Sequence, residues 1–196
     1  MTPVLSLSWP LRLALAVVGG LCLWAAFPPV GVGWLAVVGI ALMSLSSWSS
    51  RLSLALLAGF LAGLAFFVPL LAWMTIVGND AWIALGAFCA AWFALMQGGF
   101  ALVSRLRLAP IWIAAVWVAQ EALRGRIPWG GFPWGDLGFA APSTAWAHAL
   151  SWVGTAGTAF LLALMGALIA QSVVQRLTRP RVRRWWLPAC IAAGVA

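Results

Sequence analysis

Charged side chains are scarce in this 196-residue chain, which has no lysine, three acidic residues and one histidine. Hydrophobic residues make up 65% and charged residues 7% of the sequence. In a soluble domain these shares are about one half and about one quarter, so the composition excludes a soluble protein and predicts an integral membrane protein. All eleven basic residues are arginines and lie mostly between apolar runs. We interpret them as topology signals and phospholipid contacts, and expect no nucleic-acid partner.

The few cysteines and the histidine do not indicate a reactive centre. Cys22, Cys89 and Cys190 each fall in an apolar run, where we expect no base or cation beside the thiol and hence no nucleophile. Their spacing with His148 fits no metal-binding pattern, so neither a metal nor another cofactor is expected. His148 is interpreted as a solvated or hydrogen-bonded residue, because one nearby acid, Asp136, does not identify a hydrolase.

Long apolar runs separated by Gly, Pro and Arg determine the expected fold. Because lipid offers the backbone no hydrogen-bond partners, runs of about 20 residues are predicted to be helices. We expect one all-α transmembrane bundle over residues 1–196, with six full transmembrane helices plus part of a seventh and no β structure. The spans are expected at residues 9–27, 32–48, 52–77, 81–103, 108–123, 146–174 and, incomplete, 185–196.

The last of these runs is too short to cross a bilayer. It predicts that the chain is the front part of a longer protein, the alternative being a short interfacial helix. Within the other spans, Gly59 and Gly63 have the spacing of a close helix contact, and Pro69 is expected to kink its helix. Between the first two spans, residues 27–34 are expected to form a tight turn.

The arginines also predict the orientation of the bundle. With the N-terminus in the cytoplasm, the inner loops hold eight arginines and the outer loops only Arg124 and Arg126. The same orientation places Asp80 and Asp136 outside. A cleaved signal peptide is the alternative for the first span, although several further spans follow it.

The segment from Trp117 to Phe139 is the candidate for function because it holds two of the three acids. Glu121 and Arg124 are three residues apart and can pair at the end of a helix, where Gly125 can provide a left-handed stop. Such a structural pair and a contact with substrate are both compatible with this pattern.

The loop that follows combines glycines with aromatic residues. Gly130, Gly131 and Gly135 allow tight turns, so the loop can dip into the interface and line a lipid entrance. An ordinary amphipathic interfacial loop is the alternative. No residue is predicted to be catalytic, and those predicted to position lipid or substrate are Glu121, Arg124, Trp129, Phe132, Pro133 and Trp134.

Several of these stretches together resemble the membrane part of a known family. The runs Gln120-Glu-Ala-Leu-Arg-Gly125, Gly131-Phe-Pro-Trp134 and Leu137-Gly-Phe139 are similar to a motif of the apolipoprotein N-acyltransferases. Phe27-Pro-Pro, the stretch 59–67 and Trp73 look like the family's earlier signatures. The resemblance covers nearly the whole chain in order.

The resemblance implies a multi-pass enzyme of the bacterial inner membrane. Such an enzyme moves an acyl chain from a phospholipid, through a cysteine thioester, to the α-amine of a diacylglyceryl-cysteine on a lipoprotein. It further implies a Glu-Lys-Cys triad in a carbon-nitrogen-hydrolase-like domain that follows the seventh span. Because these 196 residues contain no lysine, no catalytic residue is carried over, and the chain alone is expected to be inactive.

Two alternatives come from other classes of protein. The bundle also resembles the membrane anchor of some polyprenol-phosphate mannose synthases, so it is a possible scaffold for that enzyme, with the arginine-rich stretch 176–184 as docking surface. A transporter subunit is disfavoured because the three acids lie at or beyond the ends of the spans and no internal repeat is evident.

Overall fold

The protein is a helical bundle, seen in a computed structural model that describes residues 5–128, 130–143 and 147–178. No strand occurs in these ranges, so the all-helical prediction is confirmed for the described part. The elements are α1 (Trp9–Ala26), α2 (Leu35–Ser47), α3 (Leu52–Leu70), the 3₁₀ helix η1 (Ala72–Ile76), α4 (Asn79–Val103), α5 (Ala109–Arg124), the 3₁₀ helix η2 (Leu137–Ser143) and α6 (Ala147–Thr178).

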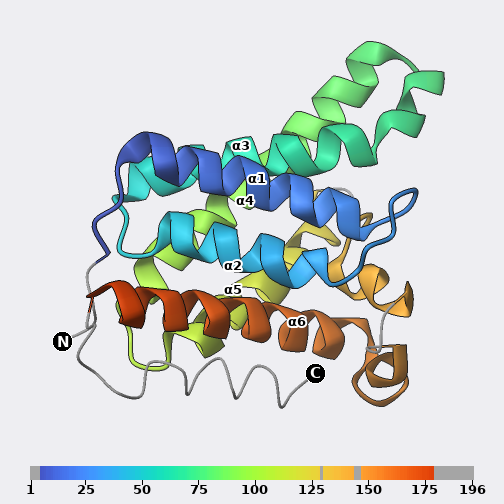
Figure 1. The fold of residues 1–196 in the computed structure, drawn as a ribbon. Coiled ribbons are helices and arrows are strands. Elements are labelled where there is room, and N and C mark those ends of the chain that lie inside the picture. Colours follow the sequence, from blue (N-terminus) through green and yellow to red (C-terminus); the bar gives the residue numbers. More distant parts are fainter. Residues whose placement is uncertain (1–4, 129, 144–146, 179–196) are drawn as a thin grey trace.

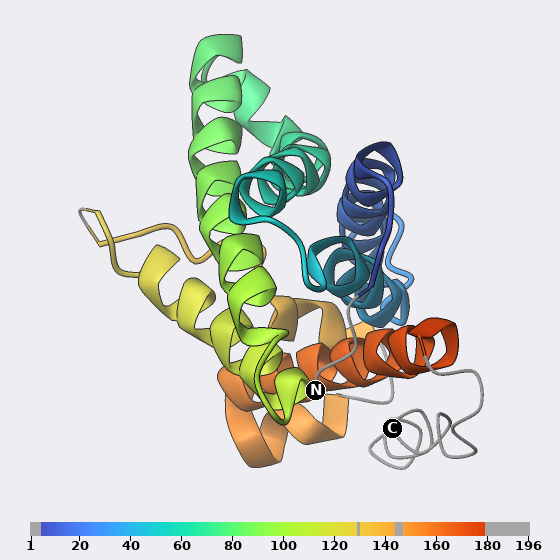
Figure 2. The same cartoon turned by 90° about the vertical axis from the view of Figure 1, so that its left-hand side faces the viewer.

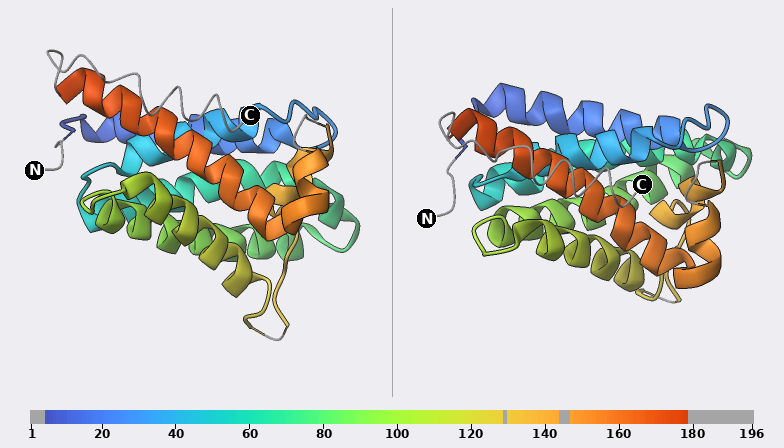
Figure 3. Two further views of the ribbon diagram at one scale, coloured as in Figure 1. Left: turned by 90° about the horizontal axis from the view of Figure 1, so that it is seen from below. Right: turned by 60° about the horizontal axis from the view of Figure 1, so that its bottom comes forward.

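Consecutive helices run antiparallel, and several of their connections lie at one end of the bundle (Figure 1). Helix α1 packs on α2 and α3, α3 packs along α4, and α6 lies across α2 and α5. The α3–α4 hairpin projects beyond the other helices, as the turned view shows (Figure 2). The turn after α1, the loop after α5, η2 and the start of α6 lie at the same end (Figure 3). This end, called the loop end below, carries the candidate site.

Four of the helices, α1, α3, α4 and α6, are long and apolar enough to cross a membrane. The expected six full spans are therefore not supported. Helix α2 has 13 residues and α5 has 16, so at about 1.5 Å per residue they reach only about 20 and 24 Å, short of a hydrocarbon core of about 30 Å. The expected incomplete span at 185–196 lies outside the described residues, as do Cys190 and the arginines at 179, 181, 183 and 184.

Two of the expected spans are interrupted. The run 52–77 divides into α3 and η1, and Pro69 lies one residue before the end of α3 instead of kinking a longer helix. Helix α6 contains a break at Gly154, whose φ of 66° and ψ of −174° are not helical. Its long continuous part therefore begins after this residue.

Glycines bring α3 and α4 into close contact, as their spacing predicted. A Cβ atom at Gly59 would lie 2.4 Å from the carbonyl oxygen of Phe93, and one at Gly63 would lie 2.6 Å from Cα of Ala90. Only glycine fits at such distances. The resulting interface supports a buried aromatic cluster in which the ring centroids of Phe67 and Phe93 are 5.1 Å apart.

The predicted turn after α1 is also confirmed. Gly31 N–H donates to the Phe27 carbonyl at 2.9 Å, and Val32 N–H donates to the Ala25 carbonyl at 2.9 Å. Gly31 has φ +70°, which glycine adopts without strain. The turn places Phe27 and Pro28 at the loop end, beside the candidate site.

At the opposite end, a buried arginine joins α1 to the C-terminus of α2. Arg12 is 4% exposed and donates to the carbonyls of Ser46 at 2.7 Å, Trp48 at 3.0 Å and Leu5 at 2.7 Å. Carbonyls in the last turn of a helix lack partners within the helix, and a cation there also complements the helix dipole. Arg12 therefore fixes α1 against the end of the short α2.

Replacing Arg12 with methionine is expected to destabilise the bundle. Methionine keeps much of the apolar stem but leaves these buried carbonyls without donors, at a cost of at least about 2 kcal/mol. The measurement is the thermal unfolding midpoint in detergent, with the exposed Arg51→Met as control. An equal midpoint for both variants would contradict the role assigned to Arg12.

Candidate functional site

The loop after α5 returns to the bundle through three glycines in left-handed conformations. Gly130, Gly131 and Gly135 have φ values of +94°, +73° and +79°, so the predicted tight turns are confirmed. A Cβ at Gly131 would lie 2.2 Å from the backbone nitrogen of Arg126, so only glycine lets this part of the loop pack against the end of α5. The predicted left-handed stop at Gly125 is wrong, since its φ is −75°.

Arg124 is the centre of this folded loop. Its side chain is fully buried, and Nη1 donates to the carbonyls of Phe132 at 2.6 Å and Trp134 at 2.7 Å. Nη2 forms an ion pair with Asp136 at 2.7 Å. The guanidinium also lies 5.1 Å from the centroid of the Phe67 ring on α3. One arginine thus fixes the loop against α5 and α3.

The predicted pair between Glu121 and Arg124 is replaced by a different arrangement. Glu121 Oε1 accepts hydrogen bonds from Trp117 Nε1 at 2.8 Å and from the Leu137 N–H at 2.7 Å, while Arg124 pairs with Asp136. Glu121 is 8% exposed. It therefore joins α5 to the start of η2 and has no ion-pair partner among the described residues.

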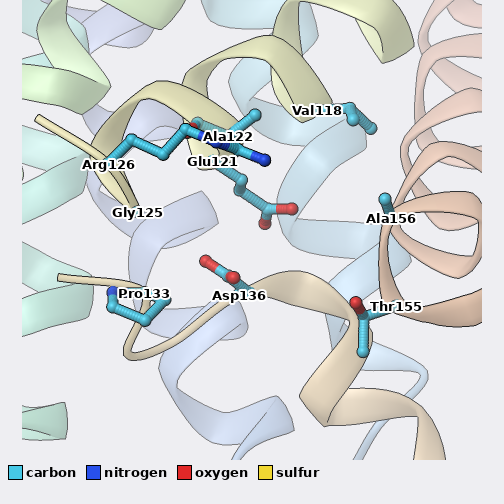
Figure 4. Close-up of a pocket in the computed structure, with 9 residues that line it drawn as sticks. All are labelled: Val118, Glu121, Ala122, Gly125, Arg126, Pro133, Asp136, Thr155 and Ala156. Carbon is cyan, nitrogen blue, oxygen red and sulfur yellow. The ribbon is translucent and has the colours of Figure 1, made fainter. Parts of the chain in front are cut away.

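A cavity of about 400 Å³, called the polar cavity below because two carboxylates line it, lies between α5, the loop before η2 and α6. Figure 4 shows the carboxylates of Glu121 and Asp136 pointing into this cavity from opposite walls. Burial raises the pKa of the Asp136 carboxyl above its usual value, although the guanidinium of Arg124 acts in the opposite direction. The remaining lining residues are Val118, Ala122, Gly125, Arg126, Pro133, Thr155 and Ala156.

An apolar groove of about 480 Å³ lies beside the same loop. The ring centroids of Trp73 in η1 and Trp134 in the loop are 5.7 Å apart. Trp73 and Trp134 are 47% and 52% exposed, so their rings face outward instead of filling the core. The groove, called the tryptophan groove below, is lined by Phe27, Pro28, Leu70, Trp73, Trp134, Gly135 and Phe139.

The residues predicted to position lipid do not all have the same surroundings. Pro133 lines the polar cavity and Trp134 the tryptophan groove, so one loop forms walls of both. Phe132 is half-buried against the core. Trp129 lies outside the described residues, and His148 is exposed on the first part of α6.

Sequence reasoning missed the role of Asp136 and the cation beside Cys89. The Cys89 thiol, buried in α4, interacts electrostatically with Arg124, so the expectation of no cation near any of the thiols is wrong. No local signal predicted this interaction, because the two residues belong to different helices. The signal for Asp136 was present in the glycines before it, which allow the loop to turn back toward α5.

The structure thus combines a helical bundle, in which four helices are long and apolar enough to cross a membrane, with an ionic cluster between α5 and the loop that follows it. Residues 19–168 match the family model described as the apolipoprotein N-acyltransferase N-terminal domain. The chain therefore belongs to the apolipoprotein N-acyltransferase family. In a search of curated proteins, no sequence matches the chain.

Proposed function

We propose that this chain is the membrane portion of a phospholipid:apolipoprotein N-acyltransferase and that its tryptophan groove holds a lipid acyl chain. The bundle would bring the lipid substrates to a separate catalytic domain that supplies the Glu-Lys-Cys triad of the family. The proposal includes a bacterial inner-membrane location with the N-terminus in the cytoplasm. The loop end then faces the outer side, where the lipoprotein amine is acylated.

The main support is the convergence of family-like stretches that are far apart in the sequence. Phe27-Pro28, Trp73 and the pair Trp134 and Phe139 line one groove, although more than one hundred residues separate the first from the last. Pockets for small molecules are commonly about 300–1,000 Å³ and mostly apolar, and the groove of about 480 Å³ falls in that range.

The placement of the groove favours a lateral path for lipid. Trp73 and Phe139 are about half exposed, and exposed aromatic rings of this kind are typical of membrane–water interfaces. An acyl chain in the groove would bury this apolar surface at about 25 cal/mol per Å². The bundle thus contributes binding and orientation, and the reacting groups come from outside this site.

Replacing Trp73 and Trp134 with alanine is expected to remove most acyl-chain binding. Loss of two facing indole rings should lower labelling by a phospholipid with a photoactivatable group in its acyl chain by roughly tenfold. The labelling is measured in phospholipid vesicles, and the labelled peptides are identified by mass spectrometry. The double variant Phe132→Ala with Trp134→Ala, at two residues that the sequence predicted to position lipid, is measured in parallel.

Trp152→Ala is the matched control, because Trp152 is 88% exposed on α6 and does not line the groove. The second readout is N-acylation of a diacylglyceryl peptide by the gene product that contains this chain, which should fall in the groove variants only. Unchanged labelling and acylation in all groove variants would refute the proposal. Labelling that falls equally in Trp152→Ala would assign the effect to the surface in general.

A further inference from the structure

The polar cavity contains a buried carboxylate without a cation of its own. Arg124 donates to two carbonyls and to Asp136, so its hydrogen bonds are directed away from Glu121. Glu121 Oε1 accepts two N–H groups, and Oε2 accepts no hydrogen bond from the described residues. A carboxylate that is more than nine-tenths buried is costly unless a cation or further donors complete its surroundings.

A second carboxylate oxygen faces the same space. Asp136 Oδ1 accepts from Arg124, and Oδ2 accepts no hydrogen bond from the described residues, so it can accept from a ligand in the cavity. Figure 4 shows both carboxyl groups projecting into the space between α5 and the loop that follows it. Two acceptors on opposite walls are suited to a donor with several N–H groups.

We infer that this polar cavity binds a primary ammonium group, with Glu121 and Asp136 as its acceptors. An ammonium carries three N–H donors on one compact charge, so it satisfies both carboxylates at once. The inference rests on the proposed function only for the source of the amine, either the headgroup of an aminophospholipid or the α-amine of the diacylglyceryl-cysteine.

Arg126 distinguishes these two sources. Its exposed side chain lines the cavity edge and donates to the Ala122 carbonyl at 2.7 Å, and within the described residues it forms no ion pair. A phospholipid headgroup carries a phosphate beside its ammonium, so Arg126 would contact it. The α-amine of a lipoprotein has no phosphate and would not depend on Arg126.

The test is competitive lipid binding to the full chain in detergent micelles. One pair of probes is phosphatidylethanolamine against phosphatidylcholine with the same acyl chains, because the quaternary ammonium has no N–H donors. The other pair is a diacylglyceryl-cysteine peptide with a free amine against its N-acetylated form. We expect at least about a tenfold preference for the primary amine in one pair, lost in Glu121→Gln.

Glutamine at position 121 keeps a carbonyl oxygen that can accept from Trp117 and Leu137, so the fold is expected to remain. Asp136→Asn is the second variant, and Asp80→Asn is the control because Asp80 is exposed on α4 away from the cavity. A lower affinity for phosphatidylethanolamine in Arg126→Gln identifies the aminophospholipid as the source. An unchanged affinity identifies the peptide amine.

The inference is overturned if the wild-type chain has no preference in either pair. It is also overturned if folded Glu121→Gln and Asp136→Asn variants keep the preference. These outcomes are separate from the acyl-chain test, because the tryptophan groove includes neither carboxylate. An amine preference without acyl-chain labelling of the groove would retain this site and refute the proposed function.

Discussion

Replacing Arg124 with glutamine is expected to release the loop after α5 and to destabilise the bundle by about 3 to 5 kcal/mol, the usual cost of breaking a buried ion pair on one side. The substitution removes the donors for Phe132, Trp134 and Asp136 at the same time. Because the loop forms walls of both the polar cavity and the tryptophan groove, lipid labelling should also fall. The measurements are hydrogen exchange of residues 132–137 and the thermal midpoint in detergent.

Two further variants separate charge from geometry. Arg124→Lys keeps the positive charge but has no planar fork to reach two carbonyls and a carboxylate together, so we expect most of the loss to persist. Arg107→Gln removes an exposed arginine in the turn before α5 and should leave both measurements unchanged. Full protection of residues 132–137 in Arg124→Gln would show that the loop is held by other contacts.

The sequence predicted the presence of the helices better than it predicted which of them are long enough to span a membrane. Apolar runs correctly indicated α1, α3, α4 and the long α6, because composition alone determines whether a helix suits lipid. The run from 32 to 48 gave a helix of only 13 residues, since the turn before it and the polar end at Ser47 shorten it. Hydropathy does not register such ends, because it averages over a window.

The ionic partners at the site were less predictable. The spacing of Glu121 and Arg124 allows an ion pair. Local spacing does not show that residues of the following loop compete for the arginine. The glycines of the loop return Asp136 to Arg124, and its backbone carbonyls then occupy the remaining donors. The glycines predict that the loop can turn, but they do not predict which residues it then contacts.

The tryptophan groove was predictable only in part. The lipid-entrance hypothesis included Trp134, and the family resemblance included Phe27 and Trp73 as separate signatures. No sequence rule showed that these residues lie around one groove, because the contact depends on where α3 ends. Helix α3 stops just after Pro69, and η1 then turns Trp73 toward the loop.

Replacing both Gly59 and Gly63 with alanine is expected to force α3 away from α4 and to produce the second large loss of stability. Alanine gains up to about 1 kcal/mol of helix propensity at each site, but overpacking costs about 1 to 3 kcal/mol where the neighbours cannot move. Here the neighbours are backbone atoms of Phe93 and Ala90, at 2.4 and 2.6 Å from the added Cβ atoms. The clash should therefore exceed the gain, measured as a lower thermal midpoint.

Gly98→Ala is the matched control on the facing helix. Its added Cβ would lie 3.0 Å from Cδ2 of Leu56 and 3.2 Å from Cδ1 of Leu52, and these flexible side-chain ends can move. We expect this variant to be neutral or more stable, and an equal loss in both variants would contradict the backbone clash. Helix α3 ends at Leu70 and is followed closely by Trp73, and both residues line the tryptophan groove. Displacing α3 should therefore also lower acyl-chain labelling of the groove. The close α3–α4 contact would then determine the shape of the lipid site as well as the stability of the bundle.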